Sequence, residues 1–198
     1  MPIKETIPNE EMEKIKNSIV RSKKLLEGGV PIQLDESTVK ETNCYAYSMG
    51  IMYNNDTKDR GYYNPGFTEH YRIDGTEDKE TLISKIEADL NNIGIQFRIL
   101  DLEDKIELEE DEYLVKVFKA EINKEIPRGD FHFVRQDRES KKWFHKIGWK
   151  RQPDIIKSDP KYNDDSIPGS EPETFTTHCK DGFKYMYYPI VYLVIKES

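Results

Sequence analysis

The chain has 198 residues, of which 36% are hydrophobic and 34% charged, with twelve tyrosines and eight phenylalanines. This length and aromatic content suit one folded domain with a sizeable core, and they exclude a disordered chain. The net charge of −8 disfavours nucleic acid and anionic membrane surfaces as partners, because both repel an acidic protein.

The sequence lacks the patterns that indicate export, a membrane span, a metal site or a bound cofactor. The stretch MPIKETIPNEEMEK has no apolar core of a secretory signal, and no apolar run approaches the roughly 20 residues that span a bilayer. We therefore expect a cytoplasmic protein whose two cysteines, Cys44 and Cys179, are free thiols. No paired-cysteine or histidine-rich spacing and no glycine-rich phosphate loop occurs, so we expect neither a metal nor a cofactor.

The first half of the chain carries the helical patterns. Residues 9–27 predict an amphipathic helix that Gly28-Gly29 ends, and residues 30–42 predict a mostly polar loop. A second helix is expected to begin at Asn43 or Cys44 and to run to about Tyr53, before a turn-rich loop at 54–67. The clearest helical period covers residues 78–93, with Gly94 as its stop.

The second half carries strand patterns with alternating or continuous apolar residues. The expected strands are 95–100, 113–122, 131–136, 142–147 and 185–196. The segment 101–112 holds eight acidic residues and predicts a solvated loop, while 148–182 predicts a long irregular loop. Pro189 implies that the last strand lies at an edge or contains a bulge. Helices followed by mostly antiparallel strands predict an α+β fold in one domain, 1–198.

The stretch TNCYAYSMG, residues 42–50, places Cys44 at the expected start of a helix. A cysteine reacts as its thiolate, and its ordinary pKa is about 8.5. Unpaired N–H groups at a helix N-terminus favour the thiolate, and a neighbouring histidine can accept the proton. A single cysteine among aromatic residues is by itself more typical of a core, so a catalytic role requires a base elsewhere.

Two of the four histidines, His132 and His145, lie in adjacent predicted strands that form a hairpin. If the turn is centred between Arg138 and Glu139, they are directly opposed on one sheet face, with Cβ atoms about 5 Å apart. We prefer a four-residue loop because Arg-Glu is not a favoured two-residue turn. One imidazole then acts as the base and the other fixes its tautomer, although a structural histidine pair has the same pattern.

The remaining polar candidates have weaker patterns. His178 and Cys179 are sequence neighbours in a poorly patterned segment, and His70 has no evident partner. Asp130 and Asp137 flank the histidine strand and are alternative orienting groups, although turn roles are more typical of both.

At these positions the sequence resembles the papain-like cysteine peptidases. NCYAYSMG is similar to their active-site helix, which opens with cysteine, an aromatic, alanine and a second aromatic. DFHF and the following WFHK are similar to the histidine strand and to the strand that supplies the third catalytic residue. That residue is asparagine in papain and commonly histidine in the NlpC-type bacterial cell-wall hydrolases, as at His145. The combined pattern also resembles that of uncharacterised bacterial and phage proteins.

The resemblance implies a papain-like fold, in which the nucleophile helix packs on a mostly antiparallel sheet. It implies Cys44 as the nucleophile, His132 as the base and His145 as its orienter. The sequence departs from the family at the oxyanion donor, a glutamine upstream of the cysteine, because that spacing falls on Thr38. Gln33 is too far upstream, so the Asn43 amide or the Thr38 hydroxyl is the candidate substitute.

These features lead to the hypothesis of a peptidase or amidase that cleaves a peptide or protein amide through a thioacyl-enzyme. A transferase or deamidase would use the same groups. Tyr45, Trp143 and Trp149 are candidates for a substrate groove, and core packing is at least as typical of the tryptophans.

The alternative is a non-catalytic binding or inhibitor protein that contacts its partner through 101–112 and 148–182. The missing glutamine and the absent export signal favour this alternative. The sequence makes no prediction of substrate identity or oligomeric state.

Overall fold

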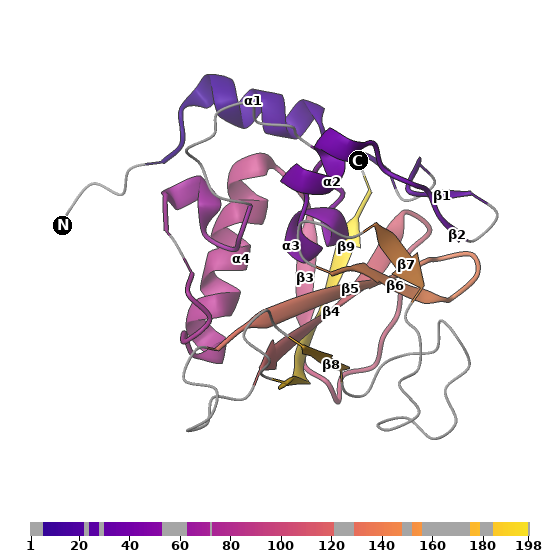
Figure 1. Ribbon diagram of the computed structural model, residues 1–198. Helices are drawn as coiled ribbons and strands as arrows, with labels where there is room; N and C mark the ends of the chain where they lie inside the picture. The colour runs from indigo at the N-terminus through magenta and orange to yellow at the C-terminus, as the bar shows by residue number, and fades with distance from the viewer. Residues whose placement is uncertain are drawn as a thin grey trace.

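A computed structural model gives the fold of the chain and describes residues 6–21, 24–27, 30–52, 63–71, 73–120, 129–147, 152–155, 175–178 and 184–197. Within these ranges, helices lie on one side of an antiparallel sheet, as predicted for an α+β fold (Figure 1). The helices are α1 (Asn9–Asn17), α2 (Glu36–Glu41), α3 (Cys44–Ser48), the 3-10 helix η2 (Phe67–Glu69) and α4 (Lys79–Ile93).

The described strands form a two-stranded hairpin and a seven-stranded sheet. The hairpin pairs β1 (Leu26–Glu27) with β2 (Val30–Pro31). The large sheet has the order β3-β9-β4-β5-β6-β7, with β8 also paired to β9. Its strands are β3 (Phe97–Leu100), β4 (Glu112–Ala120), β5 (Phe131–Gln136), β6 (Trp143–Lys146), β7 (Pro153–Ile155), β8 (Phe175–His178) and β9 (Lys184–Lys196).

The first predicted helix is much shorter than its apolar period indicates. Helix α1 ends at Asn17 rather than near residue 27, and the Ser18 hydroxyl donates to the Ile15 carbonyl at that end. Ile19 then pairs with Ile51 in an isolated antiparallel bridge, so this β-branched residue lies in an extended segment and not in a helix. The predicted loop at 30–42 also needs correction, because it contains α2, whose first N–H groups are capped by Asp35.

The helix predicted at 78–93 is confirmed almost to the residue. Asp78 caps its N-terminus by accepting from the Thr81 N–H, and Gly94 ends it at a φ of 77°. Its unexpected member is Asp89, which is fully buried. The Asp89 carboxylate accepts hydrogen bonds from Tyr45 Oη, Gly66 N–H and Thr68 N–H, and thereby ties α4 to both α3 and η2.

The sheet separates two apolar layers. The face toward the helices buries Val115, Val117, Phe133, Val191 and Leu193 together with the apolar residues of α1, α3 and α4. The opposite face buries a second cluster, formed by Leu114, Phe118, Ala120, Val134, Trp143, Tyr187, Tyr192 and Val194. Strands β4 and β5 therefore have both faces buried along most of their length, polar residues included.

Strand β9 contains the bulge that Pro189 indicated. Val117 pairs with Val191, whereas the next residue, Phe118, pairs with Pro189, so one residue of β9 is extra. This strand pairs on both sides and is not an edge. Because of the extra residue, Tyr187 and Val191 lie on opposite faces, and Tyr187 joins the layer away from the helices.

At Gly75 the chain lies directly against the backbone of the residues that precede β5. Its φ is +91°, and a Cβ atom there would lie 2.1 Å from the Gly129 carbonyl oxygen and 2.8 Å from the Asp130 nitrogen. We expect Gly75→Ala to lower the free energy of unfolding by about 3 kcal/mol, because backbone atoms cannot yield. The matched control is Gly94→Ala, whose Cβ meets nothing within 4 Å at a φ of +77°, with an expected loss of about 1 kcal/mol. Equal losses in urea titrations of the two variants would contradict this account.

Candidate active site

The candidate site begins at the N-terminus of α3, where the predicted helix start is confirmed. Asn43 is the N-cap, and its Oδ1 accepts from the Ala46 N–H at 2.9 Å. Its Nδ2 donates to Asn64 Oδ1 at 2.7 Å. Cys44 is the first helical residue and is 7% exposed. The helix ends at Ser48, earlier than expected, because Gly50 turns the chain at a φ of 73°.

The sheet opens beside this helix. Strands β5 and β6 pair at Gln136–Trp143 and Arg135–Phe144, and their ladder ends there. Further along β5, the Phe133 N–H lies close enough to the Cys44 thiol to favour its thiolate. The thiol therefore occupies the position beside β5 where an adjoining strand would continue, and we call this place the strand opening (residues 131–134 of β5 and 145–146 of β6).

The two histidines of the predicted hairpin come together at the strand opening. His132 Nε2 lies 3.0 Å from His145 Nδ1, with ring centroids 5.1 Å apart and an interplanar angle of 82°. Both side chains are 5% exposed. The His132 ring also contacts the Tyr187 ring, at 5.9 Å between centroids.

The predicted register of this hairpin is wrong by two residues, but the histidine pair survives the error. Asp137 N–H donates to the Lys142 carbonyl, so the four-residue loop is centred one residue later than expected, between Glu139 and Ser140. Continued by one pair, this register sets His145 opposite Val134 and diagonal to His132. A two-residue shift keeps side chains on the same face, so the imidazoles still meet.

The electrostatics of Cys44 differ from the expectation for a helix N-terminus. Burial raises the pKa of the thiol to about 12, and the nearby Asp130 carboxylate adds to the rise. Three groups favour the thiolate, namely the N–H groups of Phe133 and Tyr45 and the Lys146 ammonium. Together they offset only part of the rise in the thiol pKa. Helix α3 has five residues, too few for a strong macrodipole. Cys44 is therefore a neutral thiol at neutral pH.

His132 is a neutral imidazole as well. Burial lowers the pKa of His132 well below its ordinary value, and the adjacent His145 lowers it further. A resting thiolate–imidazolium ion pair is thus disfavoured from both sides. Both groups therefore rest in their neutral forms.

Two charged residues lie near the thiol. The sequence pattern gave little weight to Asp130, and Lys146 was not predicted to lie in the site. Asp130 lies half-buried before β5, and its Oδ2 accepts from Tyr187 Oη at 2.7 Å. Lys146 is fully buried in β6, and its Nζ donates to the Val39 carbonyl at 2.8 Å. Alternation in β6 places Lys146 on the same face as the buried Phe144, a signal that was present in the sequence.

A third residue, Asp154 of β7, escaped notice because its strand was not predicted. It is the register partner of His145 in the β6–β7 ladder, so the two residues share a sheet face. Strand β7 lies within the segment 148–182 that was expected to be irregular, as does β8. Most of that segment lies outside the described residues.

The candidate oxyanion donors are both engaged in helix capping. The Thr38 hydroxyl donates to Asp35 Oδ2 in the first turn of α2. The Asn43 side chain caps α3 and reaches Asn64, as described above. Neither side chain is directed by these bonds toward a substrate carbonyl.

The candidate groove residues are core residues where the structure describes them. Tyr45 is 0% exposed, with its ring 4.9 Å from the Phe133 ring, and Trp143 is 1% exposed in the layer away from the helices. Neither lines an open groove. Trp149 lies outside the described residues, as does Cys179.

The other polar candidates lie apart from Cys44. Asp137 accepts from the Ser140 N–H and hydroxyl and so has the turn role that is typical of it. His70 is exposed at the C-terminal end of η2, with a φ of 52°. Nothing in these contacts links either residue to the thiol.

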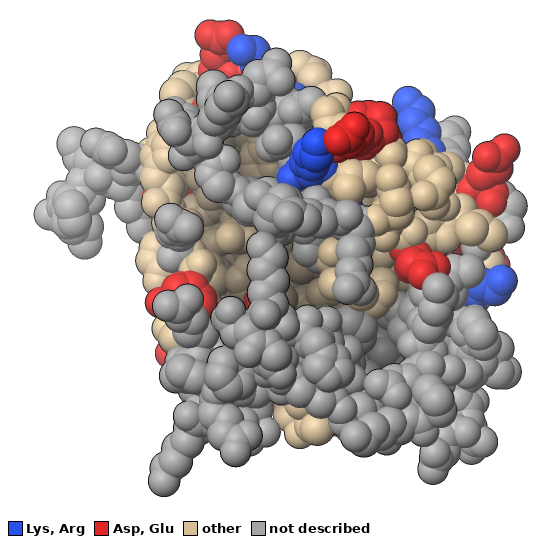
Figure 2. Space-filling view, in the orientation of Figure 1, with Lys and Arg blue, Asp and Glu red and all other residues tan. Residues whose placement is uncertain are grey.

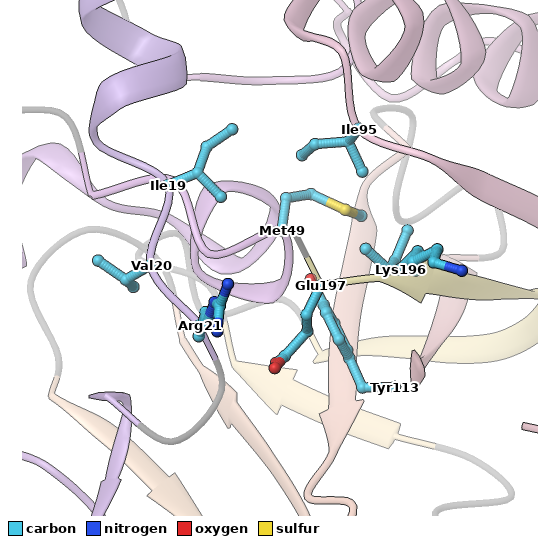
Figure 3. Close-up of a pocket in the computed structure, with 9 residues that line it drawn as sticks. Ile19, Val20, Arg21, Met49, Ile95, Tyr113, Lys196 and Glu197 are labelled. Atoms are coloured by element: carbon cyan, nitrogen blue, oxygen red, sulfur yellow. The ribbon is translucent and has the colours of Figure 1, made fainter. Parts of the chain in front are cut away.

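A small pocket lies at the other end of α3. Its lining comes from residues 19–21, Met49, Ile95, Tyr113 and the C-terminal Lys196 and Glu197 (Figure 3). Met49 follows the last residue of α3, whereas Cys44 is its first, so the helix separates this pocket from the thiol. A cavity volume of about 20 Å³ suffices for a water molecule but not for a substrate.

On the described part of one face, acidic and basic side chains are mixed (Figure 2). They stand beside one another around the helices. The acidic segment 101–112 is partly neutralised, since Glu112 pairs with Arg98, and Glu109 and Asp111 pair with Lys196. Residues 101–111 are turns and mostly exposed chain, as expected for a solvated loop, whereas Glu112 is buried at the start of β4.

Comparison with known proteins finds no family model, no curated protein and no solved structure that matches this chain. Among the described residues, no helix has the length and apolarity required to cross a bilayer. The function therefore has to be argued from the site itself.

The electrostatic account of the thiol predicts the effect of Asp130→Asn. Removing this negative charge lowers the pKa of Cys44, so alkylation by iodoacetamide at pH 9 speeds up, by about tenfold for each pKa unit. Asp104→Asn makes the same change of net charge at an exposed position and is expected to leave the rate unchanged. An unchanged or slower rate in Asp130→Asn, measured by intact mass, would show that the carboxylate does not act on the thiol.

Proposed function

We propose that this protein is a cysteine-dependent hydrolase that cleaves an amide bond through a thioacyl-enzyme. Cys44 is the nucleophile, His132 carries the proton and His145 positions His132. The observation that carries the proposal is the 3.0 Å contact of His132 Nε2 with His145 Nδ1 at the strand opening, where the Phe133 N–H lies beside the thiol. The papain-like order of cysteine helix, histidine strand and next-strand histidine supports it.

The nitrogen roles follow from that contact. His132 engages His145 through Nε2, so it acts on the thiol through Nδ1. If Nε2 donates its proton to His145 Nδ1, the tautomer that leaves Nδ1 basic is favoured. His145 thus fixes both the ring orientation and the tautomer of His132, which is the role of the third group in a nucleophile–base–orienter arrangement.

The reaction runs in two halves. The Cys44 proton passes to His132 Nδ1 as sulfur attacks the amide carbon, and the tetrahedral intermediate then collapses. The amine leaves with the proton from His132, and a thioester remains on Cys44. Water, deprotonated by His132, attacks the thioester, which releases the carboxylic acid and regenerates the thiol.

The substrate class is a peptide or protein amide, and the net charge of −8 favours a neutral or basic one. A peptidase, an amidase and a deamidase share this chemistry and differ in their leaving groups. We propose a cytoplasmic site of action, in a bacterial or phage setting, with no nucleic acid or membrane partner.

A generic acyl donor, p-nitrophenyl acetate, tests the proposal without knowledge of the substrate. The wild type is expected to release p-nitrophenolate and to form an acetyl thioester on Cys44, detected by mass spectrometry. Cys44→Ser abolishes this adduct. His132→Ala slows its formation by about 100-fold or more, the usual contribution of a general base. His70→Ala, an exposed histidine away from the site, is the matched control and retains the wild-type rate.

Two results would overturn the hydrolase assignment. One is a wild type in which Cys44 is not acetylated under conditions that acetylate a surface thiol. The other is an adduct that forms equally fast in His132→Ala and wild type.

A second candidate function is a non-catalytic binding protein on the same scaffold. The observation that favours it is the buried, neutral state of the site, since Cys44 is 7% exposed and its thiol pKa is raised to about 12. In that case the thiol and the histidine pair are core contacts. The acetylation experiment separates the two functions, because a core thiol gives no histidine-dependent adduct.

A further inference from the structure

Tyr45 follows the proposed nucleophile directly and contacts three parts of the fold. Its N–H is one of the groups that favour the Cys44 thiolate. Its ring packs on the Phe133 ring of β5, with centroids 4.9 Å apart, and its hydroxyl donates to Asp89 Oδ2 of α4 at 3.1 Å. The side chain is fully buried. Tyr45 therefore connects the thiol to strand β5 and to helix α4 at the same time.

Both oxygens of the Asp89 carboxylate also accept from backbone N–H groups. Oδ2 accepts from the Gly66 N–H at 2.6 Å, and Oδ1 accepts from the Thr68 N–H at 2.9 Å. The Thr68 hydroxyl donates to Oδ1 at 2.6 Å and in turn accepts from Asn92 Nδ2 at 3.0 Å. These bonds join α4 to η2 and give the carboxylate a fixed position.

A carboxylate satisfies these donors, whereas an amide does not. A backbone N–H only donates, so an amide at this position would set its NH₂ group against the N–H of Gly66 or of Thr68. Burial raises the pKa of Asp89 to about 6, so the group is largely ionised above pH 7. Hydrogen bonds to an ionised acceptor are stronger than those between neutral groups. Asp89 is thus a strong and fixed acceptor for the Tyr45 hydroxyl.

Helix α3 is too short to fix the position of Cys44 by itself. It has five residues, and an isolated helix of this length is not stable in water. The contacts of its side chains therefore decide where the thiol lies relative to β5. That position matters for the proposed reaction, because a misplacement of about 1 Å between reacting groups costs about 100-fold in rate.

We infer that Asp89 is a positioning residue of the site: it binds the Tyr45 hydroxyl and thereby keeps the Cys44 thiol at the place beside β5 from which its proton passes to His132. This inference rests on the proposed function. The contact lies in the core between α3 and α4, apart from the histidine pair. Without this hydrogen bond the Tyr45 ring is held by packing alone, and the thiol shifts with it.

Tyr45→Phe removes the hydroxyl and keeps the ring, so it tests this role with a small change. The matched control is Tyr113→Phe, which removes another buried hydroxyl bonded to the same helix. Tyr113 Oη donates to the carbonyl of Ser48, the last residue of α3, also at 3.1 Å. Circular dichroism and urea titration establish that each variant is folded.

The readout is the dependence of Cys44 acetylation on His132, measured by adding His132→Ala to each protein. A change in thiol pKa or exposure alters the rates with and without His132 alike, so it leaves this dependence unchanged. In the wild type, His132→Ala is expected to slow acetylation by p-nitrophenyl acetate by about 100-fold. In Tyr45→Phe, acetylation is expected to slow by about tenfold and the effect of His132→Ala to shrink to about tenfold. Tyr113→Phe is expected to keep the wild-type rate and the full effect.

A Tyr45→Phe protein in which His132→Ala still slows acetylation by about 100-fold would overturn the inference and leave Asp89 as a structural tie between the helices. An equal reduction in Tyr113→Phe would overturn it as well. Either result leaves the proposed function intact, whereas a wild type without acetylation of Cys44 overturns both.

Asp89→Asn provides a second variant at the other end of the same hydrogen bond. It is expected to reduce the effect of His132→Ala as Tyr45→Phe does, and to reduce it little further when combined with Tyr45→Phe, because both changes remove one contact. A folded Asp89→Asn protein with the wild-type dependence on His132 would contradict a positioning role.

Discussion

The end of the β5–β6 ladder at Arg135–Phe144 is the constraint on which the site depends. If the two strands stayed paired, the Phe133 N–H would be spent on β6 and unavailable to the Cys44 thiol. The same opening lets His145 reach His132 diagonally, at 3.0 Å between ring nitrogens. Helix α3 fills the opening from one face, and the layer with Tyr187 closes the other.

Burial then sets the chemistry. The thiol and the imidazole are both removed from water, so each favours its neutral form, and the nearby Asp130 carboxylate reinforces this for Cys44. In the proposed reaction, the proton leaves sulfur for His132 only when an acyl group is bound. The two candidate oxyanion donors, Asn43 and Thr38, are both engaged in capping.

Local signals in the sequence were sufficient for α4 and for the start of α3, because caps at Asp78, Gly94 and Asn43 act within one turn. The histidine pair was predictable because side-chain parity tolerates a register error of two residues. The end of α1 was not, since it depends on Ile19 meeting Ile51 far along the chain. The charge state of Cys44 could not be predicted from the sequence either, because the burial of α3 and the closeness of Asp130 to the thiol result from tertiary packing.

The central claim is that Cys44 rests as a neutral thiol and that His132 rests as a neutral imidazole oriented by His145. Nitrogen-15 NMR of histidine-labelled protein tests it most directly, with His132→Gln used to assign the resonances. The account predicts that His132 stays a neutral imidazole in a single tautomer at pH 6, because its pKa lies well below the ordinary value. An imidazolium spectrum for His132 at pH 7 would contradict it, because the pKa of this imidazole would then not be lowered by burial and by His145.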